Sequence, residues 1–178
     1  MSADHFVERL RAAVRSIPDF PSPGIVFKDI TPILSDKDLL AETIDALATP
    51  FEGLGITKVA GIEARGFILG TALAHRLGAG FVPIRKKGKL PYETHAVDYE
   101  LEYGTDSVEM HVDAVTEGDI VLIHDDVIAT GGTASATGRL IRLAGGRVLG
   151  YSFLVELAFL SGREHLDRDV QIHSLLTY

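Results

Sequence analysis

The chain has 178 residues, a length that suits one domain with a substantial hydrophobic core. It contains no cysteine, which excludes disulfides and cysteine-based zinc sites, and no apolar run long enough to span a membrane. Its net charge of −8 argues against general nucleic-acid binding, and its amphipathic N-terminal segment lacks the apolar core of a secretory signal. We therefore expect a cytoplasmic protein with no nucleic-acid or membrane partner.

The first fifty residues are predicted to form two helices separated by an extended arm. Apolar residues recur at helical spacing over residues 4–16. The segment 17–34 carries four prolines and should be irregular and extended. A second helix is expected over residues 36–50, with Ser35 or Asp36 as its N-cap.

From residue 58 onward, segments with strand and helix patterns alternate. The predicted strands cover residues 58–62, 80–84, 119–124 and 148–155, and the predicted helices cover 66–77 and 134–143, with a stop at Gly145–Gly146. This alternation is typical of an α/β fold with a doubly wound, mostly parallel sheet. Between residues 88 and 116, polar alternating stretches around Gly104 predict a β-hairpin with a mobile tip.

The stretch IVLIHDDVIATGGT, residues 120–133, carries the most specific chemistry. Its apolar run leads to Asp125 and Asp126, whose carboxylates can accept hydrogen bonds from sugar hydroxyls. A glycine-containing turn before a helix presents backbone N–H groups and the positive end of the helix dipole to an anion. The residues of this turn are Ala129, Thr130, Gly131, Gly132 and Thr133. Together these features predict a site for a sugar phosphate.

Two basic loops are expected at the same edge of the sheet, because parallel strands end on one side. One contains Arg65, and the other contains Arg85, Lys86, Lys87 and Lys89. We expect them to bind a second, more anionic group of the ligand, with Mg²⁺ retaining several waters. Structural alternatives are an ion pair for Arg65, a helix cap for Glu63 and a solvated surface for the lysine cluster.

Four ordered motifs resemble the type I phosphoribosyltransferases, and among them most closely the family that uses adenine. They are FPSPGIVFKDITPIL, GIEARGF, IRKKGKLP followed by YELEYG, and IVLIHDDVIATGGT. The resemblance implies transfer of the phosphoribosyl group of phosphoribosyl pyrophosphate to adenine, which gives AMP and pyrophosphate in purine salvage. It also implies a homodimer, Mg²⁺ held mainly by substrate and water, and a single domain. Within that domain, residues 1–35 would form an N-terminal helix and base-binding arm, and residues 85–116 a flexible lid.

The resemblance assigns a role to each candidate residue. Asp125 and Asp126 would bind the ribose hydroxyls, and Ala129 to Thr133 would bind the 5′-phosphate. The cations Arg65, Arg85, Lys86 and Lys89 would bind pyrophosphate, some of them in a neighbouring subunit. The adenine pocket would be lined by Val26, Phe27, Lys28 and the lid residue Glu102, with Tyr103 beside it. Catalysis would involve Glu102, Asp125, Asp126 and Arg65, and a cis peptide is expected near Ala64.

Two departures and two alternative functions accompany this interpretation. Lys28 stands where many relatives carry arginine, and His124, where an apolar residue is common, is interpreted as a buried histidine. The same fold could use xanthine, hypoxanthine or orotate instead of adenine. A non-catalytic regulator that senses phosphoribosyl pyrophosphate and binds nucleic acid should carry a basic surface, which a net charge of −8 does not favour.

Overall fold

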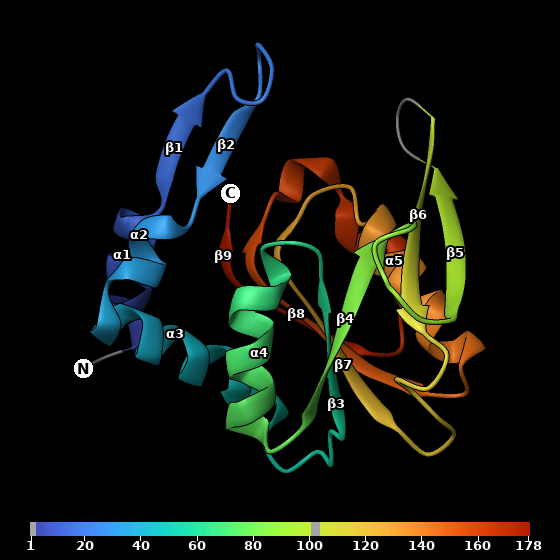
Figure 1. The fold of residues 1–178 in the computed structure, drawn as a ribbon. Coiled ribbons are helices and arrows are strands. Elements are labelled where there is room, and N and C mark those ends of the chain that lie inside the picture. Colours follow the sequence, from blue (N-terminus) through green and yellow to red (C-terminus); the bar gives the residue numbers. More distant parts are fainter. Residues whose placement is uncertain (1–2, 101–103) are drawn as a thin grey trace. The chain divides into compact units, whose positions relative to one another are not determined.

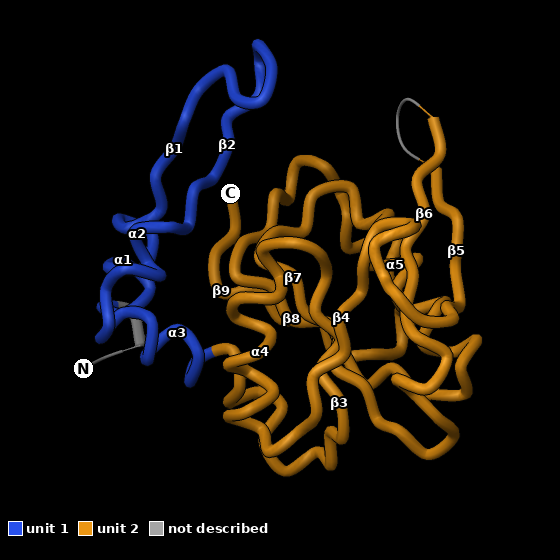
Figure 2. The backbone as a smooth tube through the Cα atoms, viewed as in Figure 1, with its two compact units in different colours: residues 1–46 blue, residues 47–178 orange. Residues whose placement is uncertain are grey.

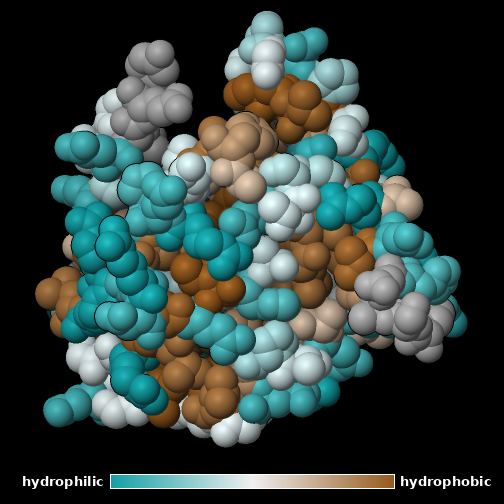
Figure 3. Space-filling model, turned by 180° about the vertical axis from the view of Figure 1, so that it is seen from behind, coloured by the Kyte–Doolittle hydropathy of each residue, from teal (hydrophilic) through white to brown (hydrophobic). Residues whose placement is uncertain are grey.

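The computed structural model describes residues 3–100 and 104–178 (Figure 1). The chain divides into two compact units, residues 1–46 and 47–178 (Figure 2). Within the described ranges, no helix combines the length and the apolar character needed to cross a membrane. Hydrophilic and hydrophobic residues intermix on the face seen from behind (Figure 3).

The first unit contains short helices and one hairpin. Its elements are α1 (Ala3–Ala13), β1 (Arg15–Pro18), β2 (Val26–Asp29), α2 (Thr31–Ser35) and most of α3 (Lys37–Ala48). The capping prediction is confirmed, because Asp36 Oδ1 accepts hydrogen bonds from the backbone N–H groups of Asp38 and Leu39, both at 3.0 Å.

The arm, predicted to be irregular, instead contains an antiparallel pair of strands, in which Ser16 lies opposite Lys28. Two of the four prolines lie in the connecting loop, whereas the other two lie at the end of β1 and within α2. In that loop, Asp19 Oδ1 accepts a hydrogen bond from the Gly24 N–H at 2.8 Å. The residues on both sides of that loop are therefore able to pair. The prediction of a wholly irregular arm was wrong because it treated the proline-rich stretch as one segment.

The second unit is built on a seven-stranded sheet with the order β5-β6-β4-β3-β7-β8-β9. Its strands are β3 (Lys58–Ile62), β4 (Gly80–Lys86), β5 (Thr94–Glu100), β6 (Thr105–His111), β7 (Ile120–Ile128), β8 (Arg147–Glu156) and β9 (Gln171–Thr177). Strands β4, β3, β7, β8 and β9 pair in parallel, whereas the β5–β6 hairpin joins the edge of β4 antiparallel. The predicted mostly parallel sheet is confirmed.

Two helices cover this sheet on opposite faces. Helix α4 (Gly66–Leu77) lies in front of the sheet in Figure 1, and α5 (Gly132–Leu143) lies behind it. On the α4 side, Gly61 leaves room for the ring of Phe81. On the other side, Ala60, Val82 and Ile123 belong to the buried cluster that includes residues of α5. Successive side chains along a strand point to opposite faces of the sheet, so a sheet with helices on both faces buries apolar residues on both sides.

Several predicted strand ends were wrong. Strand β7 continues to Ile128, opposite Glu156 of β8, so that Asp125 and Asp126 lie within the strand and not after it. Strand β4 continues to Lys86 because it pairs with β6, and this places Arg85 and Lys86 in the sheet. Strand β9 was not predicted. The short 3₁₀ helices are η1 (Thr49–Phe51), η2 (Ala158–Leu160) and η3 (Gly162–His165).

Candidate active site

The carboxyl ends of β3, β4 and β7 bring the predicted site residues of the larger unit together. In the register of the sheet, Ile62 lies beside Ile84 and Gly61 beside His124, so the three strands reach the same edge. The segments that follow are the turn after Ile62, the basic loop after β4 and the glycine loop after β7. This agrees with the rule that ligands of open α/β sheets bind beyond the carboxyl ends of the strands.

Arg65 and the acidic pair form the centre of this edge. Arg65 Nε lies 3.0 Å from Asp126 Oδ2, and the Asp126 side chain is only 4% exposed. That oxygen accepts no aligned hydrogen bond from the described residues, so its contact with Arg65 is mainly electrostatic. Asp125 Oδ1 accepts a hydrogen bond from the Asp126 N–H at 2.9 Å, and it lies 2.8 Å from the position of a Cβ atom on Gly66, too close for a side chain there.

Burial shapes the electrostatics of the acidic pair. It raises the pKa of Asp125 well above its ordinary value, and the neighbouring Asp126 charge raises it further. Burial also raises the pKa of Asp126, although the Arg65 guanidinium opposes this effect. A carboxylate pair that is poorly solvated and faces a cation is suited to accept hydrogen bonds from ligand hydroxyls.

The glycine loop leads directly into α5, as the sequence predicts. Gly131 adopts a left-handed conformation with φ +81°, and the helix begins at Gly132. The first N–H groups of a helix lack intrahelical acceptors, so they are available to an anion. Behind the loop, a Cβ atom on Gly131 would overlap the Gly162 carbonyl, and one on Gly162 would overlap the Ala129 carbonyl. Gly162 therefore supports the loop at backbone contact.

The basic loop is organised by Glu63. Its carboxylate accepts hydrogen bonds from Arg85 Nε (3.2 Å), Lys89 Nζ (2.7 Å) and the backbone N–H of Lys86 (3.0 Å). Burial alone would raise the pKa of Glu63, but the hydrogen bonds outweigh it and lower the pKa to about 2. Glu63 is thus not a helix cap, and the expected cis peptide joins it to Ala64.

The side chain of Lys86 has a different partner. Its Nζ lies 3.1 Å from Asp106 Oδ2 of the hairpin strand β6. Three of the four cations predicted to bind pyrophosphate, Arg85, Lys86 and Lys89, thus belong to one cluster held by carboxylates. The interpretation of this cluster as a merely solvated surface is not favoured.

The predicted adenine contacts lie elsewhere in the chain. Val26, Phe27 and Lys28 belong to β2 of the first unit, where the Phe27 ring packs edge to face on Phe20 at 5.1 Å and Lys28 Nζ donates a hydrogen bond to Ser16 Oγ at 3.0 Å. Glu102 and Tyr103 lie outside the described residues. The assigned roles of these residues in base binding stay predictions.

Comparison with known proteins identifies the family. The phosphoribosyl transferase domain matches residues 33–171. The chain belongs to the phosphoribosyltransferase family. It is 62% identical to the adenine phosphoribosyltransferase of Thermobifida fusca, with 92% of this chain and 93% of the relative aligned. The corresponding values for that of Myxococcus xanthus are 54%, 97% and 93%.

A solved structure agrees at the level of the whole chain. The crystal structure of adenine phosphoribosyltransferase from Rhodothermus marinus superposes with a TM-score of 0.95 at 60% identity, covering 98% of this chain and 99% of the other. The chain is therefore a phosphoribosyltransferase in fold as well as in sequence, and accordingly an enzyme of the pentosyltransferase class.

Sequence reasoning missed several residues of this phosphoribosyltransferase site. Asp106 and Tyr99 of the hairpin meet the basic loop and the glycine loop, and Gly162 supports the glycine loop from behind. The alternation of the hairpin strands could have indicated which of their side chains face the sheet, but no local signal marks Gly162. His124 is confirmed as a buried residue, and burial lowers its pKa to about 4.

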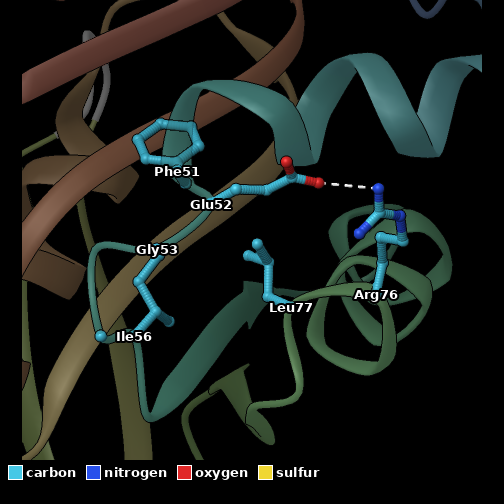
Figure 4. A pocket seen from close by; sticks show the side chains of 7 residues that line it. Phe51, Glu52, Gly53, Ile56, Arg76 and Leu77 are labelled. Atoms are coloured by element: carbon cyan, nitrogen blue, oxygen red, sulfur yellow. Dashed lines mark ion pairs between the residues drawn. The ribbon is translucent and has the colours of Figure 1, made fainter.

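The second unit also has a cavity of about 450 Å³ that is lined by none of the predicted site residues. It is lined by Phe51, Glu52, Gly53, Gly55, Ile56, Arg76 and Leu77, and Figure 4 shows the ion pair between Glu52 and Arg76 at its rim. These residues precede β3 or end α4, so the cavity lies at the amino-terminal edge of the parallel strands. The predicted site residues of this unit lie at the opposite edge.

Proposed function

We propose that this chain catalyses the reaction of adenine with phosphoribosyl pyrophosphate to give AMP and pyrophosphate. The observation that supports the proposal most directly is the ion pair between Arg65 Nε and Asp126 Oδ2, which are 3.0 Å apart. Asp126 lies on β7, the strand that leads into the glycine loop. This arrangement combines a cation, a diol-binding carboxylate pair and a phosphate loop. The curated relatives that share nearly the whole chain are named adenine phosphoribosyltransferases.

The sugar phosphate would be bound by β7 and the start of α5. The 5′-phosphate would receive hydrogen bonds from the backbone of residues 129–133 and from the Thr133 hydroxyl. Asp125 and Asp126 would accept hydrogen bonds from the ribose hydroxyls. Because cleavage of the anomeric C–O bond develops positive charge on the ribose ring, nearby carboxylates also stabilise the transition state.

The leaving group would be bound by the cations. Negative charge develops on pyrophosphate as the C–O bond breaks, and Arg65, Arg85, Lys86 and Lys89 can stabilise it. A well-placed donor of this kind contributes about 3–4 kcal/mol to the transition state. Bound Mg²⁺ would add further positive charge at the pyrophosphate oxygens.

The binding of Mg²⁺ is proposed to depend mainly on the substrate and water. In the described ranges, no three His, Cys, Asp or Glu residues are grouped so as to hold a metal ion. The residues present nevertheless suit a metal that arrives with the substrate, because Mg²⁺ is commonly held by one or two carboxylates together with substrate phosphates. Asp125 and Asp126 are the candidate carboxylates near the sugar.

Adenine would be bound by Val26, Phe27 and Lys28, and Glu102 would accept the proton that adenine loses as its new bond to ribose forms. A positioned general base typically contributes about 10²- to 10⁴-fold to the rate. The yeast adenine phosphoribosyltransferase, 42% identical to this chain, was crystallised with adenine and an imino-altritol bisphosphate. This supports adenine as the base. A homodimer and a cytoplasmic location remain parts of the proposal.

The test is a measurement of nucleotide formation. Purified protein is incubated with phosphoribosyl pyrophosphate, Mg²⁺ and an equimolar mixture of adenine, guanine, hypoxanthine, xanthine and orotate, and the products are separated by HPLC. We expect AMP to be the main product. A predominance of another nucleotide would assign a different base, and no nucleotide from any base would support a non-catalytic role.

A further inference from the structure

The β5–β6 hairpin supplies a carboxylate that the proposed reaction does not use. Asp106, on β6, lies beside Lys86, and its Oδ2 is 3.1 Å from the lysine Nζ. It is an acid in a site whose ligand is expected to carry several negative charges. A carboxylate would repel this ligand, so Asp106 must have a role other than binding it.

The Asp106 carboxylate is fixed in place from both sides. Its Oδ1 accepts a hydrogen bond from the Ser107 N–H at 2.8 Å, and its Oδ2 accepts one from the Tyr99 hydroxyl at 3.2 Å. The Asp106 side chain is 24% exposed, against 57% for Lys86. The lysine is thus the more mobile partner, able to move between Asp106 and another acceptor.

Tyr99 connects this carboxylate to the glycine loop. The tyrosine is only 7% exposed, and its ring lies 3.4 Å from the position of a Cβ atom on Gly132. Its hydroxyl oxygen accepts a hydrogen bond from Thr133 Oγ1 at 3.3 Å while donating to Asp106. Asp106 is therefore part of the wall of the site and not a distant surface acid.

The contact also affects the charge of the lysine. The hydrogen bond and the negative charge of Asp106 raise the pKa of Lys86, which means that Asp106 stabilises the charged ammonium group when no anion is bound. A pyrophosphate that binds Lys86 has to compete with Asp106 for it. The bound anion then lies near a fixed negative charge, and this repulsion favours its departure.

We propose that Asp106 is a positioning residue that competes with pyrophosphate for Lys86 and so promotes release of this product. The inference rests on the proposed role of Lys86 in pyrophosphate binding. It predicts that loss of the Asp106 charge strengthens pyrophosphate binding, whereas a residue that merely keeps Lys86 in place would weaken binding when removed.

The experiment measures binding of inorganic pyrophosphate, with Mg²⁺ present, by titration calorimetry. For Asp106→Asn we expect the Kd to fall about three- to tenfold, the scale of one partly exposed ion pair. Asp98→Asn is the matched control, because it removes the same charge from an exposed position on β5 of the same hairpin. Its Kd should stay within about twofold of wild type.

A double-mutant comparison separates the two levels of the proposal. Lys86→Met should weaken pyrophosphate binding by about tenfold or more, and in that background Asp106→Asn should tighten binding less than it does in wild type, because the competition for Lys86 is gone and only the direct repulsion remains. If Lys86→Met binds as wild type does, the proposed role of Lys86 is wrong. If Lys86→Met weakens binding but Asp106→Asn does not tighten it beyond the Asp98→Asn control, only the inference is overturned. Should Asp106→Asn fail to fold, Asp106→Ser removes the same charge and is measured instead.

Discussion

Arg65 and Asp126 connect the turn after β3 to the strand that carries the acidic pair, with Nε and Oδ2 3.0 Å apart. The aspartate side chain is 4% exposed and the arginine side chain 38% exposed, so one end of the pair is buried and the other reaches solvent. The arginine can therefore neutralise a buried charge while part of its side chain stays accessible to solvent. The contribution of this ion pair to the stability of the fold can be tested separately from its effect on catalysis.

The substitution Arg65→Met should leave the Asp126 charge buried without its cation. We expect the free energy of unfolding to fall by about 1–3 kcal/mol, measured by urea denaturation at pH 7. Arg76→Met is the matched control, since Arg76 pairs with Glu52 at 2.7 Å but both side chains are more than 40% exposed. An exposed pair of this kind is worth about 0–1 kcal/mol. Equal losses in the two variants would contradict the buried role of the Arg65 pair.

The substitution Asp125→Asn tests the ribose contact. Loss of a charged hydrogen-bond acceptor should raise the KM for phosphoribosyl pyrophosphate by about 10- to 100-fold, since such bonds contribute about 1.5–3 kcal/mol. Steady-state kinetics with saturating adenine provides the measurement. Asp113→Asn, an exposed residue after β6, should behave as wild type. Near-normal kinetics for Asp125→Asn would remove it from the ribose site.

The Glu63 carboxyl should make stability depend on pH in the acid range. Its pKa of about 2 in the folded protein is below its ordinary value of 4.5, so its ionised form stabilises the fold. That contribution is complete above about pH 4.5 and is lost as the pH falls toward 2. Wild type should therefore be more stable than Glu63→Gln at pH 6, and the difference should shrink on acidification. Chemical denaturation at a series of pH values measures it, and a constant difference would refute the assignment.

Gly162 should affect substrate binding without touching the substrate. A methyl group at this position overlaps the Ala129 carbonyl, so Gly162→Ala should displace the glycine loop and raise the KM for phosphoribosyl pyrophosphate by about tenfold or more. Gly80→Ala is the control, because its new methyl group would meet mainly the flexible Lys58 side chain. If both variants keep the wild-type KM, the loop does not depend on this contact.

The lid carboxylate is tested by kinetics alone. Glu102→Gln should lower kcat by about 10²-fold or more while leaving the KM for phosphoribosyl pyrophosphate within a few fold, as expected of a general base. Glu100→Gln, on the same hairpin, is the control. An unchanged kcat would exclude Glu102 from proton transfer.

Much of the fold could be predicted because local pattern and tertiary structure agree. The strand Lys58–Ile62 and the helix Gly66–Leu77 match their predictions, since a buried apolar run and a helical repeat are complete within each segment. The predicted ends of β4 and β7 were wrong, because pairing with β6 and β8 extends the two strands beyond their apolar runs. Long-range pairing of this kind leaves no mark in a short window of sequence.

In the candidate site, too, the features set by local sequence could be predicted and those set by long-range contacts could not. The glycine loop and the basic loop could be predicted from residue types, because the functional groups of each loop come from residues close together in the sequence. The partners of these loops could not, since Glu63 meets Lys89 and Asp106 meets Lys86 only when distant strands come together. Electrostatic neighbours are therefore the part of the site that requires the structure.

The hydrogen bonds of Glu63 matter for any attempt to transfer the basic loop to another protein. A single carboxylate anchors an arginine and a main-chain amide from the end of β4 and a lysine from the loop after it, so these groups share one point of attachment. Anyone transplanting the IRKKGKLP segment into another scaffold would need to carry the glutamate along, because without it the grafted cations would lose their common orientation.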